Sequence, residues 1–173
     1  MKIILEEVAP QYTRQAAYVV NVPWRYLEKK LSDWSEDQEV LISPDYQRAH
    51  VWTKPQQIKY VEYIMRGGHA GKQIYWNCAD WGQGYNKPIE LVDGKQRITA
   101  VRKFMNNEIE AFGYKARDFK YLRDTKLDMI FYINNLKTKK EVLQWYLDLN
   151  EGGTPHTEDE LSFVRGMLEE FKR

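Results

Sequence analysis

The chain is short of cysteine, of excess charge and of long apolar runs. Its single cysteine, Cys78, excludes an internal disulfide, and its cysteine and histidine residues do not have the spacing of zinc ligands. The N-terminus lacks the basic region and apolar run of a signal peptide, and no segment reaches the length of a membrane span. We therefore expect a protein of the reducing cytoplasm with no membrane partner.

The charge balance excludes a generally basic protein. Lysine and arginine total 26 against 25 acidic residues, so the formal net charge is +1. Any contact with nucleic acid must then use a local patch. A chain of 173 residues with 43% hydrophobic residues can bury the core of one domain, which we expect over residues 1–173.

Apolar periodicity alternates between strand-like and helix-like segments. We expect an edge strand within residues 1–8, a short hairpin within 109–119, further strands at 18–22, 40–42, 73–77, 89–92 and 128–134, and helices at 23–35, 53–66, 95–105, 139–149 and 158–171. The expected fold class is a single α+β domain with a small mixed sheet, surrounding helices and a C-terminal helical pair. Pro23 is expected to begin the first helix, and Phe171 to end the apolar stripe of the last.

The segment from Ile89 to Phe104 predicts a strand, a tight Asp-Gly turn and a helix. The first helical turn would carry Lys95, Gln96, Arg97 and Thr99 after the turn residue Gly94. A helix N-terminus attracts anions, and cations placed there oppose the helix dipole unless an anion compensates them. These residues are candidates for a phosphate site, and Asp93 for holding a metal ion or a ribose hydroxyl. Alternatively, Asp93 caps the helix while Lys95 and Arg97 are merely solvated.

Three stretches in this order carry a resemblance to a known family. They are ISPDYQRAHVW at 42–52, ELVDGKQRITAV at 90–101 and YLDLNEGGTPHTEDEL at 146–161. Together they resemble the N-terminal domain of modification-dependent restriction enzymes of the GmrSD type, within the wider ParB/sulfiredoxin-like superfamily. The motif-bearing part runs from about residue 41 to 163.

The resemblance implies that a nucleoside triphosphate is bound and hydrolysed with Mg²⁺, in a DNA-related or phage-defence setting. It implies roles for Asp93, Gly94, Gln96 and Arg97 in the turn, and for Asn150 in the third stretch. It also implicates four residues of the first loop: Tyr46, Gln47, Arg48 and Trp52. Asp93, Arg97 and Arg48 are the residues expected to act in hydrolysis, with Asp93 as the candidate metal ligand.

Several positions have a structural alternative. Arg48 could pair with Asp93 as a link between loop and turn, and Gln47 and Gln96 could brace loops. Trp52 could belong to the core rather than stack on a base. Asn150 could cap a helix C-terminus instead of joining a magnesium or triphosphate site.

Departures from the family pattern limit what it implies. Lys95 stands where the family has glutamine, and also where a sulfiredoxin-type reductase would need cysteine, so reductase activity is not expected. The family's restriction enzymes continue into an HNH-type nuclease domain, whereas this sequence ends at Arg173. A separate nuclease or defence subunit is therefore a candidate partner.

The alternative function is a non-catalytic module that binds nucleic acid or a partner protein. Aromatic residues near the basic loop would then stack on bases, namely Tyr46, Trp52, Trp76 and Trp81.

Overall fold

The computed structural model describes residues 8–9, 18–47, 52–122, 126–151 and 158–172. The described strands form one mixed sheet in the order β1-β5-β3-β4-β2. Their bounds are β1 Tyr18–Pro23, β2 Val40–Leu41, β3 Gln73–Cys78, β4 Ile89–Asp93 and β5 Asp128–Asn134. The pairs β1·β5 and β3·β4 are antiparallel, whereas β3·β5 and β2·β4 are parallel. The expected strands at 18–22, 40–42, 73–77, 89–92 and 128–134 are confirmed.

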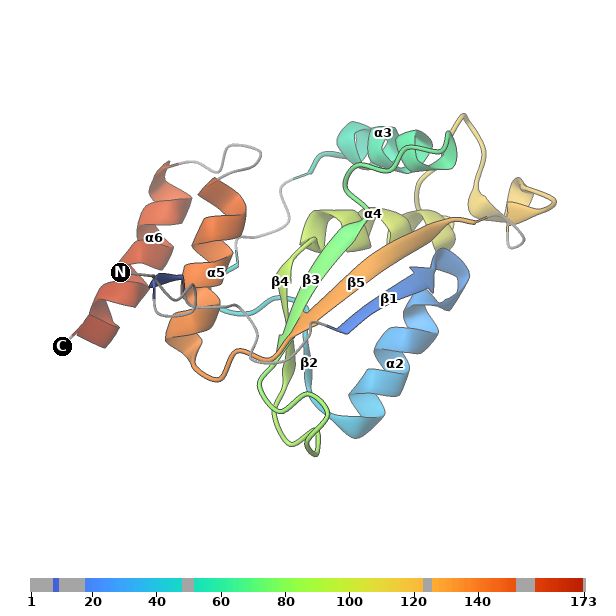
Figure 1. Cartoon of the computed structure of the whole chain (residues 1–173). Helices are drawn as coiled ribbons and strands as arrows, with labels where there is room; N and C mark the ends of the chain where they lie inside the picture. Colours follow the sequence, from blue (N-terminus) through green and yellow to red (C-terminus); the bar gives the residue numbers. More distant parts are fainter. Residues whose placement is uncertain (1–7, 10–17, 48–51, 123–125, 152–157, 173) are drawn as a thin grey trace, which may run out of the picture.

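Five α-helices lie around this sheet within the described residues (Figure 1). They are α2 Leu27–Asp37, α3 Lys54–Met65, α4 Lys95–Met105, α5 Lys139–Glu151 and α6 Glu158–Glu169. The helices α5 and α6 pack against each other as the expected C-terminal pair. The chain is a single α+β domain. None of the described helices is long and apolar enough to cross a bilayer.

The two faces of the sheet bury different clusters. In β4, Ile89 and Leu91 belong to the larger cluster, beneath α2, α3 and α4, whereas Val92 belongs to the smaller one, beneath α5 and α6. Successive side chains of a strand point to opposite faces, so β4 is covered on both sides. The end of β4 is thereby held between two layers of helix.

The start of the first long helix differs from the expectation. Pro23 ends β1 instead, a 3-10 turn follows at Trp24–Tyr26, and α2 begins at Leu27. β1 is an edge strand, where a proline without an N–H is tolerated. The expected apolar stripe is nevertheless correct, since Trp24, Leu27, Leu31 and Trp34 are all buried.

The expected hairpin within 109–119 is reduced to one bridge between Ala111 and Tyr114, followed by the 3-10 turn η2 Ala116–Asp118. Phe171 was wrongly expected to be buried: it is 48% exposed in the 3-10 turn η4 Glu170–Lys172. A 3-10 turn has three residues per turn, so the side chain leaves the α-helical stripe.

The strand expected within residues 1–8 falls almost wholly outside the described residues.

Candidate functional site

The turn between β4 and α4 depends on Gly94. Its φ is +113°, in the left-handed region that favours glycine. A Cβ at this position would lie 2.6 Å from Cδ1 of Ile74 on the neighbouring strand β3. Gly94 is also the N-cap of α4, so the alternative in which Asp93 caps this helix does not hold. The absence of a side chain lets the backbone turn directly from strand into helix.

Asp93 is paired with Arg97, one helical turn further on. An Arg97 Nη2–H donates to Asp93 Oδ2, and the Arg97 side chain is only 18% exposed. The Arg97 stem also lies near Gly71, whose ideal Cβ would be 3.7 Å from Arg97 Cδ. The Arg97 side chain is therefore held between Asp93 and Gly71, and the Asp93 carboxylate compensates its charge. The alternative partner of Asp93, Arg48, lies outside the described residues.

A small pocket lies beside this turn. Its volume is about 40 Å³, and it is lined by Gln47, Val92, Asp93, Gly94, Lys95, Gln96, Tyr146 and Asn150. The pocket thus joins all three stretches that the sequence singled out: the first loop, the β4–α4 turn and the end of α5. Arg97, Thr99, Tyr46 and Trp52 were also predicted to bind the ligand, but they are not among the residues that line it.

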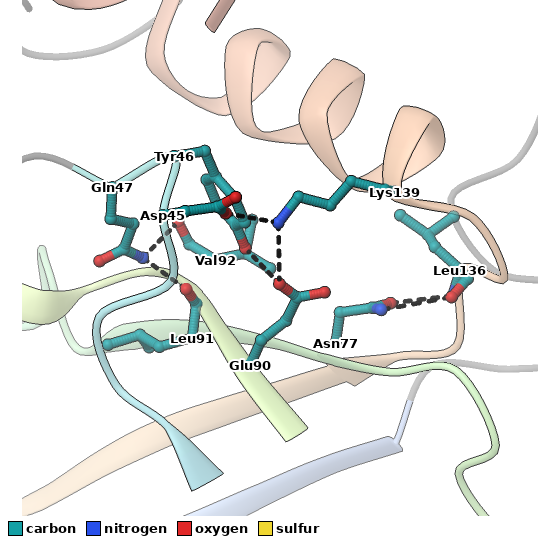
Figure 2. Close-up of polar contacts among 9 residues, drawn as sticks. All are labelled: Asp45, Tyr46, Gln47, Asn77, Glu90, Leu91, Val92, Leu136 and Lys139. Atoms are coloured by element: carbon teal, nitrogen blue, oxygen red, sulfur yellow. Dashed lines mark hydrogen bonds and ion pairs between the residues drawn. The ribbon is translucent and has the colours of Figure 1, made fainter. Parts of the chain in front are cut away.

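The two glutamines of the pocket hold its walls together. Gln47 Nε2 donates to the carbonyl oxygens of Leu91 and Val92, the latter at 3.0 Å (Figure 2). Gln96 Oε1 accepts a hydrogen bond from the Trp52 N–H at 3.1 Å. Gln47 therefore ties the first loop to strand β4, and Gln96 ties the end of that loop to the first turn of α4. The bracing role considered for both residues is observed, and both still border the pocket.

Lys95 and Asn150 also line the pocket, and Lys95 is the only cation among the described residues of its lining. Burial lowers the pKa of the Lys95 ammonium. Asn150 Nδ2 donates to Tyr146 O at 2.6 Å, and α5 continues to Glu151, so Asn150 is not the residue after the helix end. Thr99 Oγ1 donates back to Lys95 O at 2.8 Å, which keeps its hydroxyl within α4.

A polar cluster of Asp45, Tyr46, Glu90 and Lys139 lies next to Gln47 and Val92 of the pocket lining (Figure 2). Tyr46 Oη donates to Glu90 Oε2 at 3.0 Å, and Lys139 Nζ lies 2.7 Å from Asp45 Oδ1 and 4.0 Å from Glu90 Oε2. The same ammonium lies 4.3 Å from the centre of the Tyr46 ring. The cluster links the first loop, strand β4 and the first turn of α5, and Tyr46 is a buried member of it rather than a ligand-facing residue.

The titration of this cluster follows from its burial. Burial raises the pKa of the Glu90 carboxyl, with Lys139 and the Tyr46 hydroxyl opposing that rise. Burial also raises the pKa of Tyr46, and the Glu90 charge adds to the rise. Tyr46 therefore stays a neutral hydrogen-bond donor at any physiological pH.

The family model of the GmrSD restriction endonuclease N-terminal domain matches residues 29–145. The chain belongs to this family. No curated protein and no solved structure matches it.

The matched part of this GmrSD N-terminal domain includes the first loop, the β4–α4 turn and most of α5. Tyr146 and Asn150, which complete the pocket, lie just beyond it. Sequence reasoning missed Val92 and Tyr146 in the pocket, and Glu90 and Lys139 beside it. Only Glu90 gave a local signal, as the one acidic residue within the apolar segment 89–92.

The structure removes two of the four aromatic residues that the alternative function would stack on bases. Trp76 is 0% exposed and Tyr46 2% exposed, so neither ring can meet a base. Trp52 is half-buried against Tyr60, and Trp81 is half-buried against Trp34. These four residues are therefore parts of the core or of its margin in this GmrSD domain.

Proposed function

We propose that this domain binds a nucleoside triphosphate by its phosphates at the β4–α4 turn and hydrolyses it with Mg²⁺. The observation that carries the proposal is the pocket that joins Gln47, the turn 93–96 and Asn150. Its setting would be cytoplasmic restriction of DNA, as the family's name suggests, alone or with a separate nuclease or defence subunit. A ParB/sulfiredoxin-like ancestry of the fold is part of the same proposal.

The phosphate would lie against the first turn of α4. A helix N-terminus carries partial positive charge, and its backbone N–H groups point along the axis toward an anion. Lys95 adds a full charge in the same place. Because burial disfavours its charged form, an anion beside Lys95 would recover part of the lost solvation energy. Gln47 and Asn150 would add amide contacts from the other walls.

The pocket volume decides which part of the nucleotide enters. About 40 Å³ accommodates a few water-sized groups, since one water needs roughly 10–15 Å³ on this measure. The pocket therefore suits the phosphate end, with the sugar and base outside it.

The oxygen donors fit a magnesium ion that arrives with the phosphates. Mg²⁺ is usually held by one or two carboxylates together with substrate phosphates and waters. Asp93 supplies a carboxylate, and the amide oxygens of Gln47 and Asn150 are hard donors at the same pocket. The described residues contain no cluster of three acidic, histidine or cysteine side chains, so they do not form a cage that holds the ion alone.

Each residue then has a separate task. The ion would neutralise phosphate charge when bound. Asp93 would hold it, and Arg97, through its ion pair, would fix the position of Asp93 rather than touch the phosphates directly. Lys95 would stabilise charge on the phosphate oxygens as the terminal bond breaks, which is where preorganised charge lowers the barrier. Arg48 lies outside the described residues and remains a candidate to clamp the phosphates at the same site.

Calorimetric titration of ATP, GTP, CTP and UTP, with and without Mg²⁺, tests the proposal. We expect one of them to bind with Mg²⁺, to raise the melting temperature, and to release phosphate in a colorimetric assay. Lys95→Ala should weaken binding about 10- to 100-fold, the cost of losing a charged hydrogen-bond partner. Lys140→Ala, which removes an exposed lysine of α5, is the control and should bind as the wild type does.

Equal, weak binding by the wild type, Lys95→Ala and Arg97→Ala would reject the site. Tight binding with no phosphate release would reject hydrolysis and favour the non-catalytic alternative. Binding without hydrolysis would fit the ion pair of Arg97 with Asp93, because a guanidinium held by a carboxylate gives less stabilisation to the phosphate charge of the transition state.

A further inference from the structure

A second cavity lies at the opposite end of α4 from the phosphate pocket. It has a volume of about 490 Å³ and is lined by Met105, Asn107, Ala116, Arg117, Phe119, Lys120 and Leu122. The 11 residues of α4 separate the two sites by about 16 Å at 1.5 Å per residue. In Figure 1 this corner lies far from the pair α5 and α6. Its size falls within the roughly 300–1,000 Å³ of small-molecule sites.

The lining combines an apolar floor with cations at the rim. Met105, Phe119 and Leu122 supply apolar surface and belong to the margin of the larger core cluster. Arg117 and Lys120 supply the positive charge, and both side chains are exposed. A cavity of this kind suits a ligand that has a flat apolar ring and an anionic group.

Exposed aromatic rings flank the cavity. Tyr114 is 59% exposed and its ring lies 6.0 Å from that of Phe119 in the cavity wall. Tyr121 is 62% exposed, and Lys120 Nζ lies 5.1 Å from its ring centre. Large aromatic rings that stay exposed together commonly mark a binding surface. Here they would provide stacking platforms next to Phe119 and Lys120 of the cavity lining.

Three acids (Glu108, Glu110 and Asp118) balance three cations (Lys115, Arg117 and Lys120) over residues 107–122, but the cavity lining itself holds Arg117 and Lys120 and no acid. Asp118 Oδ2 accepts a hydrogen bond from the Lys115 N–H at 2.8 Å, so the carboxylate caps the turn η2. Its other oxygen lies 3.9 Å from Arg117 Nε, the outer limit of an ion pair, while the Arg117 side chain is 69% exposed. The guanidinium therefore keeps most of its surface available to an anion.

We infer that this corner binds an unpaired nucleotide of a nucleic-acid strand. The base would enter the cavity against Phe119, neighbouring bases would stack on Tyr114 and Tyr121, and the phosphates would lie on Arg117 and Lys120. Alternating cations and aromatic rings are the usual means of holding single strands, because every base has a face that stacks and every nucleotide has a charge. The inference goes beyond the proposed nucleotide hydrolysis and does not depend on it.

Fluorescence anisotropy of the full chain with a labelled single-stranded DNA oligonucleotide, and with its duplex, tests the inference. We expect the single strand to bind more tightly than the duplex, and binding to weaken as salt rises. Arg117→Gln/Lys120→Gln should make the plot of log affinity against log salt shallower by about 1.4, at about 0.7 per lost phosphate contact. Tyr121→Ala should weaken binding roughly 5- to 100-fold.

Lys87→Gln/Lys140→Gln is the matched control, since it removes the same charge from two exposed lysines outside the 107–122 corner. Circular dichroism should show that every variant is folded, and phosphate release should be unchanged by Arg117→Gln/Lys120→Gln. Equal loss of binding in the control, an unchanged salt dependence, or tighter binding of the duplex would each overturn the inference.

Discussion

Glu90 shows what a single buried acid does beside the site. Burial raises its pKa, so the folded state holds a proton more readily than the unfolded chain does. Between the ordinary glutamate pKa and the raised value, the folded state holds more protons than the unfolded chain does. The free energy of unfolding therefore falls as pH rises through that window. Lys139 and Tyr46 limit this cost by facing the charge.

We expect Glu90→Gln to gain stability relative to the wild type as pH rises. Glutamine keeps an oxygen that accepts a hydrogen bond from the Tyr46 hydroxyl. Because it does not titrate, it removes the loss of stability that ionisation of Glu90 causes as pH rises. Urea unfolding of both proteins at several values between pH 4 and pH 8 measures the difference in free energy. A difference that shrinks with pH would mean that Lys139 stabilises the charged form more than burial destabilises it.

Gly94 provides a second prediction at the residue scale. Gly94→Ala combines a positive φ with a contact to Ile74, so we expect a loss of about 2–4 kcal/mol in the free energy of unfolding. Gly67→Ala is the matched control: its φ is +87°, but a Cβ there meets no atom within 4 Å. It should cost only the backbone strain, about 1 kcal/mol. Equal losses in urea unfolding would show that Ile74 moves aside freely.

At the scale of helices and strands, local chemistry predicted most elements and the position of the main turn. Gly67 follows the C-cap of α3 and Asn106 is the C-cap of α4, which agrees with the expected helix ends at residues 66 and 105. Pro23 was misplaced because its role depends on lying at the sheet edge, which follows from strand order and not from the local sequence. The burial of Tyr46 was missed for a similar reason, since its partners Glu90 and Lys139 are distant in sequence.

The capping box of α3 gives a prediction for one element. Thr53 Oγ1 accepts the Gln56 N–H, and the Gln56 side chain accepts the Thr53 N–H at 2.8 Å. Thr53→Ala should reduce the free energy of unfolding by about 1 kcal/mol, whereas Thr53→Ser should retain most of it. Urea unfolding distinguishes the two. A serine variant as unstable as the alanine variant would assign the effect to the lost methyl group instead.

For the whole molecule, the sheet separates a large cluster from a small one, and the proposed phosphate pocket borders the small one through Val92 and Tyr146. The smaller cluster holds α5 and α6 against Val92 and Tyr46, and the pocket takes Tyr146 and Asn150 from α5. Regions that bury fewer apolar side chains open at lower free energy than the rest of a protein. We therefore expect the α5 side of the pocket, with Tyr146 and Asn150, to open at lower free energy than the β4–α4 side.

Hydrogen exchange followed by mass spectrometry should resolve this difference. We expect the amides of α5 to exchange faster than those of β3, β4 and β5, because the smaller cluster opens without unfolding the sheet. A nucleotide bound at the proposed site should then slow exchange in α5 as well as at the start of α4, since it would contact both elements. Lys95→Ala should abolish both effects together. Protection confined to α4 would place the nucleotide on the turn alone and remove Asn150 from the site.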